Sequence, residues 1–312
     1  MRALVIHNPA SGPRTGDVFS FVRSALQPRD ELVLRATASA GDIPGLCGDA
    51  ADFDVVVASG GDGTVSRVAH AVRDANVPVL AFPSGTANLF ANNLGCATEP
   101  AALAATLRDG RLARFDMGEI EYVTTAGERA REGFLTMAGA GFDANIMIDS
   151  QELKPMFGQL SYYLSAFNNP HPTYSRLTLT LDGERVDTHG ICVLVGVWGM
   201  ANPNFELIPG SSPQDGLLDV EILETSNATR LIPAVIGSLL GQGVNDPEIK
   251  VHHAREITLA CDPELPMQFD GEVIENATTP FTIRVIPGGI TTFVDALSPF
   301  YADARPLPWG QA

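Results

Sequence analysis

Apolar runs and amphipathic stretches alternate along the first third of the chain. Four short apolar runs predict buried parallel strands, at 2–7, 31–36, 54–58 and 78–82. The stretches between them repeat apolar side chains with helical spacing, as at Val65, Val68, Ala69 and Val72. This alternation of strand and helix predicts a doubly wound, mostly parallel α/β sheet.

Polar or glycine-rich turns follow three of the predicted strands, at 8–12, 59–64 and 83–88. Ligands of doubly wound sheets bind beyond the carboxyl ends of the strands. We therefore expect the three turns to converge on one cleft.

The turn Gly60-Gly61-Asp62-Gly63-Thr64 leads from a strand into a helix. Glycine lets the backbone approach a ligand closely, and the N-terminus of a helix attracts phosphate. The carboxylate of Asp62 suits an anion site when a divalent cation stands between it and the phosphate. The pattern favours a nucleotide triphosphate site with Mg²⁺, and the alternative is a tight turn in which Asp62 caps the helix.

From about residue 115 the pattern changes to strand-like runs separated by Pro and Gly turns. The runs lie at 176–181, 191–197, 217–223, 256–261, 281–286 and 290–294, and Asp182-Gly183 is typical of a hairpin turn. They predict a β-rich domain with helices near 156–167 and 228–241. We expect an α/β domain over 1–117, the β-rich domain over 118–295, and a poorly ordered tail over 296–312.

Composition narrows the function classes. The net charge of −17 and the isoelectric point of about 4.6 exclude a general nucleic-acid binder and oppose docking to anionic membranes by bulk charge. The four cysteines are far apart, without metal-ligand spacing, and are interpreted as buried thiols of a reducing compartment. The N-terminus has no signal-peptide pattern, and no run reaches the roughly 18 apolar residues of a spanning helix. We expect a cytoplasmic protein.

Five motifs occur in the order of the diacylglycerol kinase catalytic-domain family, and the chain resembles its soluble bacterial lipid kinases, relatives of the sphingosine and ceramide kinases. The motifs are Asn8-Pro9-Ala10-Ser11-Gly12, Gly60-Gly61-Asp62-Gly63-Thr64, Pro83-Ser84-Gly85-Thr86-Ala87-Asn88, Asp215-Gly216 and Asp270-Gly271-Glu272. The resemblance covers residues 1 to about 295. It implies a first domain with the fold of NAD kinases and diacylglycerol kinases, and a β-sandwich-like second domain.

The resemblance also implies an activity, the ATP-dependent phosphorylation of a lipid hydroxyl on a diacylglycerol-like acceptor. The implied nucleotide-binding residues are Asn8, Pro9, Ala10, Ser11, Gly12, Thr37, Gly60, Gly61, Asp62, Gly63, Thr64, Val65, Ser66, Gly85, Thr86 and Asn88. Asp62 would help to arrange Mg²⁺ and the phosphates, and Glu272 would accept the proton of the acceptor hydroxyl. A further metal site would use Ser212, Asp215 and Leu217. Such an enzyme would touch a membrane transiently through local apolar contact; the identity of the lipid and the formation of a homodimer stay open.

Several of these residues have a plainer interpretation. On its own residues, Asp270-Gly271-Glu272 is typical of a hairpin turn and Asp215 of a turn former. The stretch 139–144 resembles the family's lipid cleft, or else packs its glycines closely. The aromatic side chains of the predicted 156–167 helix form core, or else a wall for acyl chains; they are Phe157, Tyr162, Tyr163 and Phe167.

The chain departs from the family pattern at two positions. Pro13 stands where the family often has a basic residue, and Leu89 stands where many bacterial members have Asp, whereas Lys154 matches a family lysine. Two rival functions are a small-molecule kinase like NAD kinase or phosphofructokinase, and a non-catalytic protein that binds nucleotide or lipid. The motifs at Asn8 and Pro83 favour the lipid enzymes, and the presence of Asp62 and Glu272 opposes the non-catalytic alternative.

Overall fold

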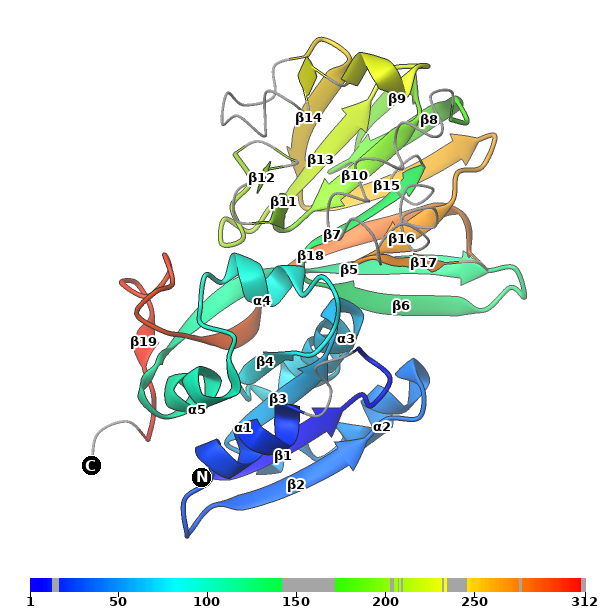
Figure 1. Cartoon of the computed structure of the whole chain (residues 1–312). Helices are drawn as coiled ribbons and strands as arrows, with labels where there is room; N and C mark the ends of the chain where they lie inside the picture. Colours follow the sequence, from blue (N-terminus) through cyan, green and yellow to red (C-terminus); the bar gives the residue numbers. More distant parts are fainter. Residues whose placement is uncertain are drawn as a thin grey trace. The chain divides into compact units, whose positions relative to one another are not determined.

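The computed structural model divides the chain into two compact units, one of residues 1–116 and 287–312, the other of residues 117–286. It describes residues 1–12, 17–141, 172–202, 205–206, 208, 210–231, 233–234, 246–274 and 277–309. The long strands β5 (Arg111–Thr124) and β18 (Ala277–Val294) each run from one unit into the other (Figure 1).

The first unit is built on a parallel sheet with the strand order β2-β1-β3-β4. These strands are β1 (Arg2–His7), β2 (Glu31–Ala36), β3 (Val55–Gly60) and β4 (Val79–Pro83). The end of β18 joins beside β4, where Thr292 pairs with Val79. Every residue of β3 and β4 is buried, which is why both read as continuous apolar runs.

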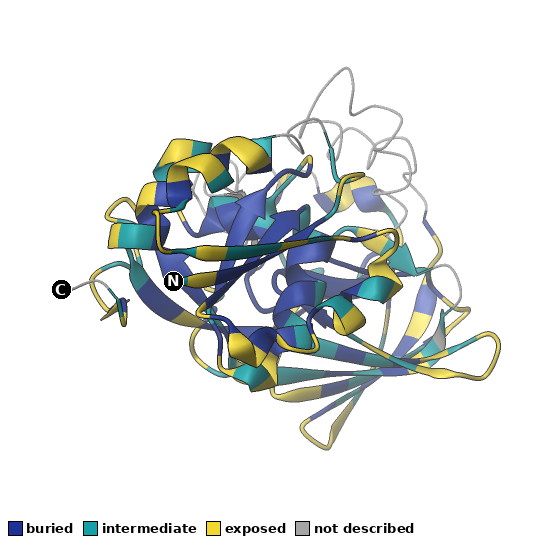
Figure 2. Ribbon diagram, turned by 90° about the horizontal axis from the view of Figure 1, so that it is seen from below, coloured by how far each residue is buried: buried dark blue, intermediate teal, exposed yellow. Residues whose placement is uncertain are grey.

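Helices cover both faces of this sheet. They are α1 (Asp17–Ala25), α2 (Ile43–Leu46), α3 (Asp62–Val72), α4 (Leu89–Asn93) and α5 (Pro100–Asp109), with 3₁₀ turns η1 (Ala40–Asp42), η2 (Ala50–Asp52) and η3 (Arg73–Ala75). Phe21 of α1 and Leu107 of α5 share one core cluster with Val5 and Val57 of the sheet. Figure 2 shows the central strands mostly dark blue and the outward helix faces yellow, the burial expected of amphipathic helices on a sheet, whereas the edge strand β2 is only partly buried.

The strand order creates a switch point between β1 and β3. The connection from β1 leads to β2 on one side of it, and β3 lies on the other side. At such a point the loops that leave neighbouring strands diverge and open a crevice at the carboxyl edge. The turns after β1 and β3 are therefore placed together by topology.

The C-terminal segment differs from its prediction as a poorly ordered tail. β19 (Arg305–Pro306) pairs with Leu112 and Arg111 of β5, and Leu307 is buried. The indole Nε1 of Trp309 donates to the carbonyl of Leu107 at 3.3 Å. Residues 296–309 belong to the first unit because their apolar side chains complete its core.

The second unit is a sandwich of two antiparallel sheets. One sheet has the order β14-β13-β10-β7-β16-β17, built from β14 (Ile249–Ala254), β13 (Leu218–Leu223), β10 (Cys192–Gly196), β7 (Met137–Gly141), β16 (Met267–Phe269) and β17 (Glu272–Ile274). The other contains β18, β15 (Glu256–Asp262), β8 (Ser175–Leu181), β9 (Glu184–Gly190), β5 and β6 (Arg129–Phe134). A small ribbon pairs β11 (Met200–Asn202) with β12 (Phe205–Glu206).

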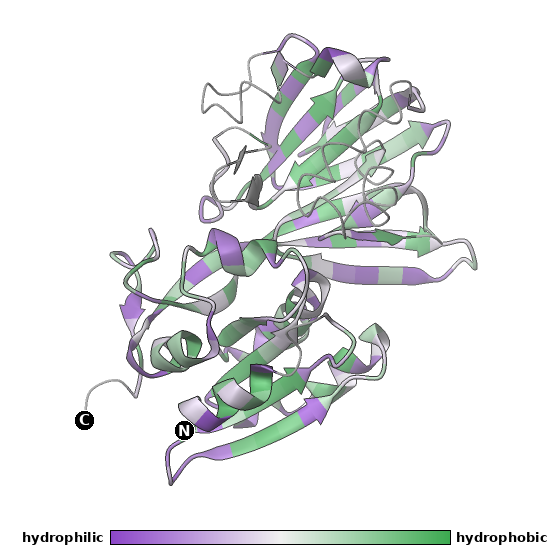
Figure 3. Cartoon of the chain, viewed as in Figure 1, coloured by the Kyte–Doolittle hydropathy of each residue, from purple (hydrophilic) through white to green (hydrophobic). Residues whose placement is uncertain are grey.

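Alternating side chains from the two sheets form one buried core. Val193 and Val220 reach it from the six-stranded sheet, and Leu179, Ile257 and Phe281 reach it from the other. Figure 3 shows the matching hydropathy pattern, green and purple alternating along these strands. The predicted α/β domain and β-rich sandwich-like domain are both confirmed.

Two predicted helices fall wholly or partly outside the described residues. The 156–167 helix, with its aromatic stripe, lies outside them, as does Lys154. Of the predicted 228–241 helix, the structure describes the 3₁₀ turn η4 (Ala228–Leu231) and residues 233–234.

Candidate functional site

The three turns predicted to converge do meet in the first unit, and hydrogen bonds join them. The side-chain amide of Asn8, at the end of β1, donates to Thr64 Oγ1 of α3 at 3.0 Å. The hydroxyl groups of Ser11 and Ser84 lie 2.7 Å apart and join the first turn to the third. The backbone N–H of Thr37, after β2, donates to the carbonyl of His7 at 2.9 Å and so brings a fourth strand end to the group.

Glycine lets these turns approach each other more closely than other residues would. A Cβ atom on Gly85 would lie 2.5 Å from the Cα of Gly61, and one on Gly12 would lie 2.7 Å from the carbonyl oxygen of Ser84. Gly12 also has a φ of +147°, which side chains disfavour. The spacing of glycines in the three motifs thus reflects contact between the turns.

Helix α3 begins at Asp62, directly behind the Gly60-Gly61 turn, with Gly61 as its N-cap residue. The first turn of an α-helix leaves backbone N–H groups without intrahelical acceptors, and the helix dipole is positive there. The N-terminus of α3 therefore offers N–H donors to an anion at the edge where the three turns meet.

The carboxylate of Asp62 has a contact that the sequence did not predict. Its Oδ1 accepts the backbone N–H of Phe90 at 3.0 Å, in the first turn of α4. Asp62 is the first residue of α3 and Gly61 is the N-cap residue, so Asp62 does not occupy the capping position that the alternative interpretation gave it. Instead it connects the second turn to the helix that follows the third.

The third turn is held by its own asparagine. Asn88 has a left-handed backbone with φ of +50°. Its side chain accepts the N–H of Gly85 at 3.0 Å and donates to the carbonyl of Gly85 at 2.8 Å. Thr86, between them, is exposed, so a ligand can reach its side chain.

Sequence reasoning missed the buried pair beneath these turns. The Nδ1 of His7 lies 3.1 Å from Ser59 Oγ, and His7 is 5% exposed. Burial lowers the pKa of His7, so the imidazole is neutral at pH 7. His7 ends β1 and Ser59 lies in β3, and only the pairing of these strands brings the two together.

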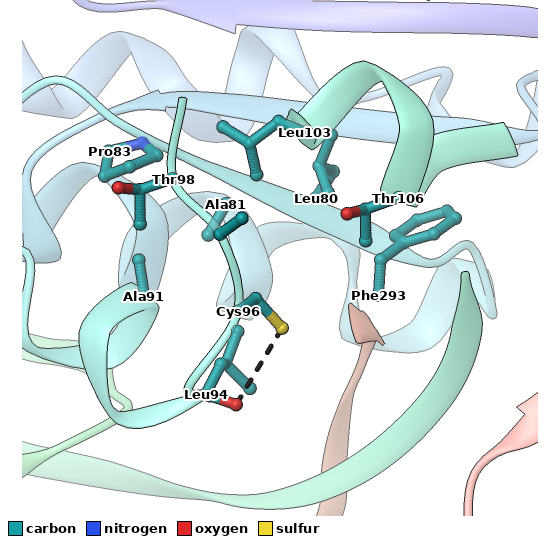
Figure 4. Close-up of a pocket in the computed structure, with 11 residues that line it drawn as sticks. Leu80, Ala81, Pro83, Ala91, Leu94, Cys96, Thr98, Leu103, Thr106 and Phe293 are labelled. Carbon is teal, nitrogen blue, oxygen red and sulfur yellow. Dashed lines mark hydrogen bonds between the residues drawn. The ribbon is translucent and has the colours of Figure 1, made fainter. Parts of the chain in front are cut away.

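An apolar pocket lies beside the third turn, between β4 and the segment from α4 to α5 (Figure 4). Its lining includes Leu80, Pro83, Leu94, Leu103 and Phe293. The Cys96 thiol in its wall points to the carbonyl of Leu94, and burial raises the pKa of this thiol to about 11. None of the described residues that line it is among the predicted nucleotide-binding residues.

In the second unit, Asp270 and Gly271 form the two-residue turn of the β16–β17 hairpin, with φ of +42° and +84°. The Asp270 carboxylate is buried and accepts the backbone N–H groups of Leu135 and Thr136 at 2.8 and 2.9 Å. It also accepts the Thr136 hydroxyl at 2.5 Å. These bonds fix the hairpin to the start of β7 and leave Glu272 exposed at the first position of β17.

Asp215, the candidate metal ligand, is exposed, and its Oδ1 accepts the backbone N–H of Leu217 at 2.9 Å. This is the local turn expected of an Asp before Gly. Among the described residues, no three His, Cys, Asp or Glu side chains come together as metal ligands would. A cation at Ser212, Asp215 and Leu217 would need backbone oxygens, so this site stays a prediction.

The remaining sequence predictions concern the 139–144 stretch, the cysteines and membrane-spanning helices. Gly139 and Gly141 of the 139–144 stretch pack closely, because Cβ atoms there would lie 2.4 Å from Val193 O and 2.2 Å from Ile191 O. Residues 142–144 of that stretch lie outside the described residues, as does Pro13. All four cysteines are free thiols. None of the described helices is long and apolar enough to cross a membrane.

Comparison with protein families gives two adjoining matches. Residues 2–120 match the family described as diacylglycerol kinase catalytic domain. Residues 136–294 match the family described as YegS C-terminal NAD kinase beta sandwich-like domain.

Full-length relatives agree with these matches. A protein named diacylglycerol kinase from Bacillus subtilis is 29% identical over 280 residues, covering 87% of this chain and 89% of its own. A protein named "Probable lipid kinase YegS-like" from Pseudomonas fluorescens is 30% identical over 299 residues, covering 91% and 94%.

Solved structures show the same fold. A diacylglycerol kinase from Bacillus anthracis superposes with a TM-score of 0.73 at 24% identity, covering 95% of this chain and 97% of its own. A yeast NADH kinase complexed with NADH superposes with a TM-score of 0.54 at 12% identity, covering 95% and 84%.

Proposed function

Because the chain belongs to the lipid kinase family that carries the diacylglycerol kinase catalytic domain, we propose that it transfers the γ-phosphoryl group of ATP to a hydroxyl of a diacylglycerol-like lipid. One observation carries the proposal: three glycine-containing turns are bonded together at the carboxyl edge of a parallel sheet, around the N-terminus of α3. Phosphoryl transfer needs this kind of fixed, donor-rich cradle more than it needs covalent chemistry.

The residues of the first unit fit a triphosphate. Close packing of Gly61 on Gly85 lets backbone N–H groups face a phosphate without a side chain between them. Asn8 holds the first turn against α3 through Thr64, so the donors are oriented before a ligand arrives. When bound, ATP supplies the phosphoryl group, and Mg²⁺ offsets the negative charge of the β- and γ-phosphates.

Asp62 is the proposed residue for Mg²⁺ in this unit. Its Oδ1 is oriented by the N–H of Phe90, which fixes the carboxylate at the junction of the second and third turns. Carboxylate oxygen is a ligand that Mg²⁺ prefers, usually with water and substrate phosphate completing the shell. At the first position of α4 this chain has Leu89, where many bacterial members of the family have Asp. Asp62 would therefore bind Mg²⁺ without a second carboxylate from that position.

Glu272 is the proposed general base. A base must hold its carboxylate where it can reach the acceptor hydroxyl, and it must be ionised in order to take the proton. The turn before Glu272 is fixed through the buried Asp270, and the Glu272 side chain is exposed at the start of β17. The proposal assigns the proton of the lipid hydroxyl to this carboxylate.

Ser212, Asp215 and Leu217 are the proposed second cation site, with a structural role in the second unit. The support is the Asp215-Gly216 motif, which lies within the matched residues 136–294, together with the turn in which Asp215 accepts the N–H of Leu217. We further propose that the lipid is reached by transient, apolar contact with a membrane, since the net charge of −17 opposes anionic surfaces. Crystals soaked with Mn²⁺ test the cation site by anomalous signal at Asp215.

The test of the function uses labelled ATP and a panel of acceptors in detergent micelles: diacylglycerol, phosphatidylglycerol, sphingosine, NAD⁺ and fructose 6-phosphate. We expect label in a lipid. Label in NAD⁺ alone would favour the small-molecule kinase, and ATP binding without transfer to any acceptor would favour a non-catalytic protein.

The chain contains a matched control for the proposed base. Asp182-Gly183-Glu184 repeats the tripeptide Asp270-Gly271-Glu272 in another hairpin of the same unit. We expect Glu272→Gln to lower kcat by at least 100-fold with ATP affinity unchanged, since general-base catalysis contributes about 10²–10⁴-fold. Glu184→Gln should keep full activity. Equal activity of the two variants would remove Glu272 from the role and leave the nucleotide site in place.

A further inference from the structure

Strand β13 carries a glutamate on a buried face. Leu218, Val220 and Ile222 point into the core between the two sheets, so the alternate positions, 219, 221 and 223, face the opposite side of the six-stranded sheet. That side is also covered, and Glu221 is only 4% exposed. A glutamate so thoroughly buried is uncommon unless it is paired.

The described neighbours of Glu221 give it no charged partner. Directly across the two adjoining strands are Leu194 of β10 and Val251 of β14. Leu194 and Leu223 belong to an apolar cluster on this side of the sheet. Within the part of the chain that the structure describes, the buried Oε2 atom of Glu221 has no hydrogen-bond partner, and no lysine or arginine there forms an ion pair with it.

Other ionisable groups occupy the same face. Asp219 lies two residues before Glu221, and its Oδ1 is 2.7 Å from His253 Nδ1 of β14, within hydrogen-bond distance. Cys192 of β10 pairs with Leu223, two residues along β13 from Glu221. His252 and Lys250 pair with core-facing positions of β13 and so belong to the other face. The charge nearest to Glu221 along its own strand is therefore negative.

An ionised carboxylate in these surroundings is strongly disfavoured. Burial of a charge without a partner costs several kcal/mol in general, and the group responds by taking up a proton. Burial raises the pKa of Glu221 to about 8, from an ordinary value of 4.5. The geometry and the pKa agree that the carboxyl group is neutral in the folded protein at pH 7.

We propose that Glu221 is a buried proton-binding site that couples the stability of the second unit to pH: its carboxyl is protonated in the folded protein and ionised in the unfolded chain. The proton is released to solvent on unfolding and taken up again on folding. None of the residues assigned to the proposed reaction takes part in this equilibrium.

The direction of the effect follows from the two protonation states. Between pH 4.5 and about 8 the folded protein binds one more proton at this residue than the unfolded chain does. Stability therefore falls as pH rises through this window, by about tenfold in the folding equilibrium constant per pH unit, and levels off above it. Glu221→Gln cannot ionise and loses this dependence.

The experiment follows unfolding of the second unit through its own tryptophan. The chain has two tryptophans, and Trp309→Phe leaves Trp198, which is buried in the second unit, as the only one. In this background, urea unfolding is measured at pH 5.5, 6.5 and 7.5 for the parent, Glu221→Gln and Glu184→Gln. We expect the folding constants of the parent and of Glu184→Gln to fall about 100-fold more over the two pH units than that of Glu221→Gln. Parallel pH dependences in all three proteins would overturn the proposal.

A second measurement does not depend on folding of the variant. Infrared spectra of the folded wild-type protein report the carbonyl band of a protonated carboxyl group. We expect such a band at pH 6.5 and its disappearance by pH 10. Absence of the band at pH 6.5 would refute the proposal even if Glu221→Gln failed to fold.

Discussion

Replacing Gly85 by alanine tests whether contact between the turns is what makes the nucleotide site. The added Cβ would lie 2.5 Å from the Cα and 3.2 Å from the backbone nitrogen of Gly61, and 3.0 Å from Asn88 Oδ1. Carbon atoms in ordinary contact are about 3.5–4.0 Å apart, so the two turns must separate by about 1 Å. The atoms that obstruct the methyl group include backbone, which cannot rotate away as a side chain can.

The magnitude follows in two parts. Overpacking of one methyl group typically costs about 1–3 kcal/mol of stability. A displacement of about 1 Å in a positioned site can cost about 100-fold in rate, because the phosphate donors of α3 and the third turn no longer point at one place. We expect Gly85→Ala to lower kcat/KM for ATP by about 100-fold while the protein stays folded.

Gly45 provides the matched control in the same unit. A Cβ atom there meets nothing within 4 Å, and the residue lies in helix α2. We expect Gly45→Ala to keep full activity and to raise the unfolding free energy by less than about 1 kcal/mol. ATP titration by calorimetry, micelle kinase assays and urea unfolding of both variants complete the comparison. If Gly85→Ala binds and turns over ATP as Gly45→Ala does, the turns do not form the site.

Three further predictions concern stability and use urea unfolding. Asp270→Asn should lower the free energy of unfolding by about 3 kcal/mol, because an amide NH₂ would face buried N–H donors. The control Asp182→Asn, in the exposed hairpin, should lower it by less than about 1 kcal/mol. Equal losses in the two variants would contradict this prediction. Burial by itself raises the pKa of Asp30, but hydrogen bonds from Arg108 and the N-terminal ammonium outweigh it and lower the pKa to about 2. Because the folded pKa is depressed, this contribution is present above pH 3.8 and is lost as pH falls toward 2, and we expect about 2 kcal/mol of acid destabilisation that Asp30→Asn lacks. Deleting residues 304–312 should lower the free energy of unfolding by at least about 2 kcal/mol, because it removes the buried Leu307 and exposes the apolar surface beneath it. Unchanged stability would instead support the sequence prediction of a poorly ordered tail.

The sequence predicted the continuous apolar strands of the first unit and the alternating strands β8 and β15, and it missed strands whose exposed positions are mostly charged. β1 and β2 have the predicted bounds, and β3 and β4 shift by one or two residues. β6 and β9 were missed because charged residues occupy their exposed positions, and only pairing with β5 and β8 buries the others. Two predicted strands, 281–286 and 290–294, are one strand, β18. Pro287-Gly288 suggests a turn, yet the N–H of Gly288 donates to Asp116 at 2.7 Å and the strand continues.

For the candidate site, the sequence predicted which turns meet but not how they are joined. Topology alone brings the ends of β1, β3 and β4 to one edge, so alternation of strand and helix was sufficient. The contacts of Ser11 with Ser84 and of Asp62 with Phe90 join positions far apart in the chain. No local pattern encodes such pairs, and Ser84 and Phe90 were absent from the predicted site for that reason.

The two Asp-Gly-Glu hairpins show where local sequence stops being informative. Both turns have the same backbone, with φ of +48° and +89° at Asp182 and Gly183, and +42° and +84° at Asp270 and Gly271. The first Asp is exposed and the second is 8% exposed, with its carboxylate bonded to the segment before β7. The hairpin interpretation of Asp270-Gly271-Glu272 is therefore correct, and it does not compete with a role for Glu272 in catalysis. In Asp270-Gly271-Glu272 the first residue bonds the turn to the core, so the turn holds the backbone of the third residue rigidly. A residue proposed as a general base requires such a fixed position.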